Sequence, residues 1–198
     1  RRMHAQTGLP LDVLVDHVLV DAGSSDGTIE QVECEFPDVT VVRTHSQIYW
    51  NQGMRLAWQT ALKHEYSAYL LLNDDTFLFD DAMARLYGLL LDKSGPQTLP
   101  SIVVGSTSSN GFLTYGGYRH RKPNSIHYDL IEPTNRPQRC DTMNGNCVLV
   151  NHSCVATIGI LSPAFAHAGG DLEYGLRAAR AGIPIWVAPG FYGHCSRD

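Results

Sequence analysis

Short apolar runs rich in β-branched residues alternate along the chain with segments whose apolar residues recur at helical spacing. That alternation is typical of a sheet covered by helices. The apolar runs predict six strands: His17 to Asp21, Val39 to Arg43, Ala68 to Asn73, Ile102 to Gly105, Cys147 to Val150 and Pro184 to Ala188. The pattern therefore predicts one Rossmann-like α/β domain with a mixed, mostly parallel sheet.

Segments of helical periodicity lie between these runs. The predicted helices are Thr28 to Phe36, Asn51 to His64, Asp80 to Leu91 and Asp171 to Ala181. Gly182 is well placed to cap the last of them. The stretch from Ser106 to Arg139 is different, because it is rich in Gly, Pro, Asn, Ser, Tyr and basic residues and has little periodicity. We expect it to be an irregular insert that closes over a ligand.

Composition narrows the class of protein. The chain has 198 residues, of which 43% are hydrophobic and 18% charged, which suits one buried core. A net charge of −5 without a Lys/Arg cluster argues against nucleic acid as a partner. There is no apolar run of about 18 residues, which a membrane span requires, and no signal-peptide core at the start. We therefore expect a cytoplasmic protein.

Five cysteines form no Cys-x-x-Cys pair, which suits a reducing compartment. Cys140, Cys147 and Cys154 recur every seven residues, with His152 close by. A zinc site is conceivable there, but this spacing matches no known ligand pattern. We expect buried or incidental thiols instead.

A first group of polar residues follows the predicted strand that ends at Asp21. The turn that comes next consists of small residues and leads into a helix. Asp26 and Ser25 are explained as helix caps, and Gly27 as a turn residue. Capping leaves Asp21 unexplained, and at the carboxyl end of a strand its carboxylate would point into a ligand crevice, where it could accept the N–H of a nucleobase.

A second group follows the strand that begins near Ala68, where four apolar residues are followed at once by Asn73, Asp74 and Asp75. Adjacent carboxylates are often only a solvated turn. Two like charges side by side are unfavourable, however, unless a cation offsets them. Divalent cations prefer oxygen ligands, so Asp75 is the candidate metal ligand.

Two further groups lie near the end of the chain. Asp171 stands at a helix start after two glycines, where it is either an N-cap or a general base. Glu173 and Arg177 have the i,i+4 spacing of an exposed salt bridge. His194 follows the last strand and could complete a metal site, although a lone histidine is more often structural.

These segments, in this order, resemble glycosyltransferase family 2, an inverting family with the GT-A fold. The turn GSSDGT after Asp21 resembles the nucleotide-binding turn of that family. The string YWNQGMRLAW, residues 49–58, and the LNDDT string, residues 72–76, resemble a bacterial rhamnosyltransferase-like branch. MNGNCVLV, residues 143–150, is similar to the acceptor-side segment, and GDLEYGLRA, residues 170–178, to the segment of the catalytic base.

The resemblance implies a role for each matching residue. Contacts to the nucleotide-sugar would come from Asp21, Asn51, Gly53, Arg55, Asn73 and Asp74. Mn²⁺ or Mg²⁺ would be held by Asp75 and His194, and Asp171 would be the catalytic base. Acceptor contacts would come from Asn144, Gly145, Asn146 and Glu173.

The chain departs from the family at two site positions and at its start. Asn73 replaces a carboxylate of the metal motif, and Gly170 replaces the glutamate before the base. The family also begins with a strand and helix that would precede Arg1, and it continues with a variable part after Asp198 that often meets the membrane. We therefore expect a GT-A domain without its first strand, with peripheral membrane association as an implied property.

The activity implied is transfer of a sugar from a nucleotide diphosphate-sugar, dTDP-rhamnose or a UDP-sugar, to a hydroxyl of a glycan or lipid-linked acceptor in polysaccharide biosynthesis. Two alternatives stay open. A sugar-nucleotide pyrophosphorylase uses a similar sheet and also binds Mg²⁺. A catalytically inactive glycan- or nucleotide-binding module is favoured by the departures at Asn73 and Gly170.

Overall fold

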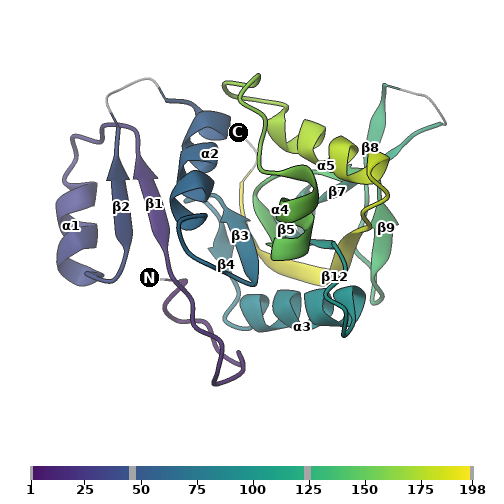
Figure 1. Cartoon of the computed structure of the whole chain (residues 1–198), viewed down its shortest axis with the longest axis horizontal. Coiled ribbons are helices and arrows are strands. Elements are labelled where there is room, and N and C mark those ends of the chain that lie inside the picture. Colours follow the sequence, from purple (N-terminus) through teal and green to yellow (C-terminus); the bar gives the residue numbers. More distant parts are fainter. Residues whose placement is uncertain (1, 45–47, 123–125, 197–198) are drawn as a thin grey trace. The chain divides into compact units, whose positions relative to one another are not determined.

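The computed structural model describes residues 2–44, 48–122 and 126–196 (Figure 1). The chain forms two compact units. The large unit comprises Arg1–Pro10, Ser67–Gly159 and Asp171–Asp198, and the small unit comprises Leu11–Tyr66 and Ile160–Gly170. Each unit is described by itself.

The small unit contains a two-stranded parallel sheet. Strand β1 (Val18–Asp21) pairs with β2 (Thr40–Arg43), and Asp21 lies opposite Arg43 at the carboxyl ends. Helix α1 (Thr28–Glu35) connects the two strands, and α2 (Trp50–Ala61) packs against β1. Helix α2 approaches β1 at Gly53, where an added Cβ would lie 3.9 Å from Cγ1 of Val20. The predicted strands and helices of this unit are therefore confirmed to within a few residues.

The large unit is built on a seven-stranded sheet with the path β3-β11-β5-β12-β4. These strands are β3 (Ala68–Leu72), β11 (Cys147–Asn151), β5 (Ile102–Ser109), β12 (Ile185–His194) and β4 (Phe77–Leu78). Strand β6 (Phe112–Tyr115) pairs with β5, and β9 (Gln138–Cys140) pairs with β12. The prediction of a mixed sheet flanked by helices is confirmed.

The expectation that this sheet would be mostly parallel is wrong. Strands β5 and β12 run parallel, whereas the other pairs of the seven-stranded sheet are antiparallel. The reason is that β11 lies between β3 and β5 and runs against both. All five of its residues are buried, so it has the continuous apolar pattern of a parallel strand. The burial of a strand on both faces, and not its direction, determines whether its sequence is an uninterrupted apolar run.

Helix α3 (Ala82–Ser94) covers one face of the large sheet, as Figure 1 shows. Its buried side chains Leu86 and Leu90 share a core with Val103 of β5 and Leu149 of β11. The alternate residues of these strands are also buried, and α4 (His152–Ile158) contacts β11. The sheet is therefore buried on both faces, which leaves its strand ends as the places for polar side chains.

The segment from Ser106 to Arg139 is not irregular, contrary to the prediction. It supplies the end of β5, then β6, and two strands, β7 and β8, of a second, three-stranded sheet in the order β10-β7-β8. These strands are β10 (Thr142–Met143), β7 (Gly117–His120) and β8 (Tyr128–Leu130). Strands this short, rich in Gly, Tyr and Arg, have no apolar alternation that the sequence pattern could reveal. Residues 123–125 of the segment lie outside the described residues.

Two smaller predictions are also settled. Cys140, Cys147 and Cys154 are buried free thiols, and burial raises the pKa of Cys140 and Cys147 to about 12 and that of Cys154 to about 11. They are therefore protonated and act as small apolar residues. Gly182 adopts a left-handed φ of 74° just after α5 (Gly170–Arg180), as predicted.

Every helix within the described ranges is too short or too polar to cross a membrane.

Candidate active site

The turn Asn144–Gly145–Asn146, between β10 and β11, connects three of the predicted site segments in the large unit. The backbone N–H of Gly145 donates to Oδ2 of Asp171 at 3.0 Å. The carbonyl of Asn146 accepts from the N–H of Asn73 at 3.3 Å. The side-chain amide of Asn146 reaches Sγ of Cys195 at 3.6 Å. The start of α5, the end of β3 and the end of β12 therefore meet at this turn.

Asp171 presents its carboxylate in the first turn of α5. Its Oδ1 accepts from the N–H of Leu172 at 2.8 Å, while Oδ2 accepts from Gly145. The side chain is only partly buried. A negative charge at a helix N-terminus is favourable, because the unpaired backbone N–H groups carry partial positive charge. Asp171 is thus held in one orientation as an acceptor that a second molecule can still reach.

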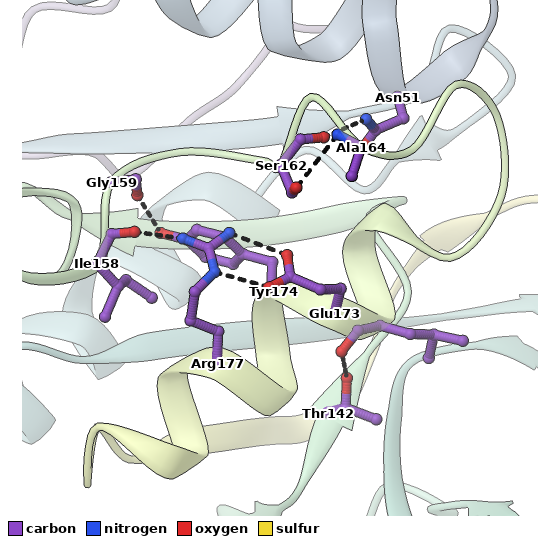
Figure 2. A network of polar contacts seen from close by, with 10 residues as sticks. Asn51, Thr142, Ile158, Gly159, Ser162, Ala164, Glu173, Tyr174 and Arg177 are labelled. Atoms are coloured by element: carbon purple, nitrogen blue, oxygen red, sulfur yellow. Dashed lines mark hydrogen bonds and ion pairs between the residues drawn. The ribbon is translucent and has the colours of Figure 1, made fainter.

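The first turns of α5 are fixed by buried contacts (Figure 2). Thr142 is fully buried, and its hydroxyl donates to the carbonyl of Leu172 at 2.7 Å. Gly175, one turn later, packs so closely that a Cβ there would lie 2.8 Å from Cα of Thr142. Both contacts join α5 to β10, and so they determine where Asp171 lies.

Arg177 provides a second anchor for the same helix (Figure 2). Its guanidinium pairs with both oxygens of Glu173, at 2.8 and 3.0 Å, and donates to the carbonyl of Ile158 at the end of α4. The hydroxyl of Tyr174 donates to the carbonyl of Gly159 at 3.2 Å. The predicted Glu173–Arg177 pair is present, but it is only about 30% exposed and also holds the end of α4. The predicted i,i+4 salt bridge is therefore confirmed, but it lies on a half-buried face and not on an exposed one.

We expect Gly175→Ala to lower the free energy of unfolding by about 1–3 kcal/mol, because the added methyl group must push Thr142 or Met143 away. Gly88→Ala in α3 is the matched control, since a Cβ at that exposed helix position meets nothing within 4 Å. The control should gain about 0.5–1 kcal/mol from helix propensity. Urea denaturation of both variants measures the difference, and equal stability of the two would contradict the close contact.

The end of β3 carries the predicted metal ligand. The carboxylates of Asp74 and Asp75 are exposed, and the N–H of Thr76 donates back to the carbonyl of Asn73 at 3.2 Å, which closes a tight turn. The next strand, β4, pairs with β12 so that Phe77 lies opposite His194. The imidazole of His194 is exposed and contacts the ring of Phe79 edge-on, with centroids 5.0 Å apart.

Cys195 links these two segments. The thiol is 2% exposed, and its pKa is raised first by burial and also by the nearby charge of Asp75. The exposed carboxylate of Asp75, the exposed imidazole of His194 and the amide oxygen of Asn73 therefore occur on adjoining segments. Oxygen ligands with one imidazole suit Mn²⁺, and oxygen ligands alone suit Mg²⁺, so the residues present fit the expected cation.

In the small unit, the carboxylate of Asp21 accepts hydrogen bonds from the turn that follows it. Its oxygens accept from the backbone N–H groups of Gly23 and Ser24 at 3.1–3.2 Å. Hydrogen bonds from Ser24, then from Gly23, hold the pKa of Asp21 below its ordinary value. The turn therefore gives Asp21 a structural role that the sequence did not reveal. Asp26 accepts from the N–H of Thr28 at 3.0 Å, close to the predicted cap.

Asn51 is fully buried at the start of α2. Its amide donates to the carbonyl of Ser162 at 3.0 Å (Figure 2). The same amide donates to the carbonyl of Phe165 at 2.6 Å. A Cβ at Gly170 would collide with this amide. Any larger residue at position 170 would displace Asn51, which explains why glycine stands where the resembling family has glutamate. The nucleotide contacts predicted for Asn51, Gly53 and Arg55 stay predictions.

Some positioning residues were missed by sequence reasoning. Gly175 inside a predicted helix was a usable signal, because an interior glycine often marks a close approach. Thr142 and Cys195 carry no such signal, since their roles depend on contacts with distant segments, Leu172 in one case and Asp75 and Asn146 in the other.

The structure was also compared with known proteins. Neither the protein-family models nor the curated protein sequences contain a match. The fold is similar to a crystal structure of GalNAc-T7 with UDP, GalNAc and Mn²⁺, with a TM-score of 0.69, 17% identity and 97% of this chain covered. The chain has a GT-A-like fold. It spans 39% of the GalNAc-T7 chain. It is also similar to A197 from STIV, with a TM-score of 0.56, 12% identity, and 92% of this chain and 85% of that chain covered.

Proposed function

We propose that the chain is the donor-binding domain of a glycosyltransferase that moves a sugar from a nucleotide diphosphate-sugar to a hydroxyl of a glycan or lipid-linked acceptor. One observation supports this most directly. On a GT-A-like fold, the turn at Gly145 and Asn146 holds the carboxylate of Asp171 beside the end of β3, where Asp74 and Asp75 stand exposed. A base at the start of a helix and a cation site at the neighbouring strand end suit group transfer from a diphosphate.

Asp171 acts as the general base of this proposal. Its carboxylate takes the proton of the acceptor hydroxyl while that oxygen attacks the anomeric carbon on the face opposite the diphosphate. The bond from the anomeric carbon to the diphosphate breaks, and the configuration inverts. The Gly145 and Leu172 N–H groups keep the carboxylate oriented for this step.

Asp75 and His194 are the residues that would hold the divalent cation. When bound, Mn²⁺ or Mg²⁺ offsets the negative charge of the leaving diphosphate. Asn73 contributes a neutral oxygen where the resembling family has a carboxylate, so the affinity for free cation should be low and should rise with nucleotide present. Asp21, Asn51, Gly53 and Arg55 border the nucleotide in this proposal. The Mn²⁺ and UDP bound by GalNAc-T7 support the donor class.

Incubation with UDP-hexoses, UDP-N-acetylhexosamines and dTDP-rhamnose in the presence of Mn²⁺ tests the proposal. We expect one donor to be converted to its nucleotide diphosphate and free or transferred sugar, and EDTA to stop the conversion. NMR of the new anomeric proton should show inversion. Binding without any release of nucleotide diphosphate would instead establish an inactive binding module. Synthesis of a nucleotide-sugar from nucleotide triphosphate and sugar phosphate would establish a pyrophosphorylase.

A further inference from the structure

The three-stranded sheet carries a polar and aromatic cluster that the proposed chemistry does not use. Across its strands, Tyr118 lies opposite Thr142 on one side and Leu130 on the other, and His120 lies opposite Tyr128. Side chains alternate along a strand, and opposed residues point the same way. Tyr118, His120 and Tyr128 therefore share the face of this sheet that carries Thr142.

That face adjoins the first turn of α5. Thr142 donates its hydroxyl to the carbonyl of Leu172, the residue next to Asp171. Asp141 immediately precedes Thr142. The hydrogen bond from Thr142 to Leu172 therefore joins the residue after Asp141 to the residue after Asp171, the proposed base. One short oligosaccharide could contact both segments.

His120 and Asp141 form an oriented pair. Oδ2 of Asp141 accepts from the backbone N–H of His120 at 2.8 Å and lies 3.0 Å from Nδ1 of its ring. Burial acts to raise the pKa of Asp141, but the hydrogen bonds from His120 outweigh it and hold the pKa below its ordinary value. Because an ionised carboxylate only accepts, Nδ1 carries the proton, and in neutral His120 Nε2 is then a hydrogen-bond acceptor.

The cluster is also accessible. The side chain of His120 is 31% exposed and that of Asp141 41%. The ring of Tyr128 lies against His120, with centroids 4.5 Å apart and planes inclined by 48°. Oδ1 of Asp141 has no hydrogen-bond partner among the described residues. An incoming molecule therefore meets the rings of Tyr118 and Tyr128, the Nε2 atom of His120 and the Oδ1 atom of Asp141.

This chemistry suits a neutral ligand with several hydroxyl groups. The arginines of the sheet, Arg119 and Arg121, stand on the opposite face, where they bond to the carbonyl of Arg139 and to Asp129. A phosphate or carboxylate would meet the negative charge of Asp141, on which the charge of Arg119 also acts. A sugar ring offers hydroxyl donors for Nε2 and Oδ1 and an apolar C–H face for the tyrosine rings.

We propose that His120, Asp141 and Tyr128 form a binding site for a sugar unit of the acceptor, beside the acceptor hydroxyl that Asp171 activates. The site rests on the proposed function for its biological role. Its carbohydrate binding, however, can be measured without transfer.

Saturation-transfer NMR with methyl glycosides of rhamnose, glucose, galactose and N-acetylgalactosamine is the test, in the presence of UDP and Mn²⁺. We expect at least one glycoside to bind the full chain, and its affinity to fall at least about tenfold in His120→Phe, which keeps a ring but removes both nitrogens. Tyr128→Leu should weaken the same glycoside. Asp129→Asn, on the other face of the same hairpin, is the matched control and should leave binding unchanged.

Binding of none of the glycosides, or equal binding by His120→Phe and the unchanged chain, would overturn the site. Donor hydrolysis by water is measured alongside and should stay within about twofold in all three variants, because they lie away from the donor residues. If hydrolysis is absent from the unchanged chain while the His120-dependent binding persists, the proposed transferase fails and the carbohydrate site stands.

Discussion

Asp171→Asn is expected to lower the rate of sugar transfer by about 10²- to 10⁴-fold, the range that a positioned general base contributes. The amide cannot take the acceptor proton, although it occupies the same volume as the carboxylate. The affinity for UDP with Mn²⁺ should change by less than about twofold, because the proposed role of Asp171 is on the acceptor side. Initial rates at saturating donor, with calorimetric titration of UDP, separate the two effects.

The geometry at Asp171 also predicts a side effect of this substitution. Both oxygens accept backbone N–H groups, from Leu172 and from Gly145, and an asparagine amide can satisfy only one of them. The variant should therefore lose about 1 kcal/mol of stability. Thermal melting shows whether the lost rate merely reflects unfolding. A folded variant that transfers sugar at the normal rate would show that another group is the base.

The sequence reveals buried strands well and their directions poorly. Strands β1, β3 and β11 were predicted because runs of apolar residues fill them, and all lie within a residue or so of the expected bounds. Helix α4 was missed because it has seven residues and one capping signal, Asn151, whose side chain accepts from Cys154. Short helices and strands depend on tertiary contacts, which a single sequence does not display.

The candidate site shows the same division. The end of a strand was sufficient to single out Asp75, because polar residues there interrupt an apolar pattern. The helix start at Asp171 left an N-cap and a general base both open, and only the family resemblance favoured the base. The turn at Gly145 that connects their segments was assigned only by resemblance, as acceptor contacts, and its hydrogen bonds are backbone bonds that no side-chain pattern encodes. Buried Asn51 adds a structural contact that the motif did not reveal, because its amide donates to the carbonyls of Ser162 and Phe165, while its predicted nucleotide contact stays a prediction.

The departure at Asn73 bears on how tightly the cation is held. With one carboxylate fewer than the resembling family, the proposed site would depend more on oxygens of the diphosphate to hold a cation. Cation and nucleotide should therefore stabilise the protein together far more than either does alone, because each completes the other's binding site. This coupling gives the metal assignment a readout that does not depend on catalysis.

Asp75→Ala is expected to abolish the thermal stabilisation that UDP and Mn²⁺ produce together. At ligand concentrations about 100-fold above the dissociation constant, binding stabilises a native protein by about 2.7 kcal/mol. For a chain of this length that corresponds to a rise in Tm of about 5–10 °C. Asp75 is exposed, so its removal should leave the Tm of the ligand-free protein nearly unchanged.

Asp80→Ala is the matched control, because this exposed carboxylate lies five residues further along and pairs only with exposed Arg2 in the described structure. It should keep the full Mn²⁺-dependent rise in Tm. His194→Ala should keep part of it, since an imidazole adds one ligand to a set of oxygens that Asp75 and the diphosphate already supply. If Asp75→Ala retained the rise while Asp74→Ala lost it, the cation would be held by the neighbouring carboxylate. Because Asp74 and Asp75 share a turn closed by the bond from Thr76 to Asn73, only this comparison separates them.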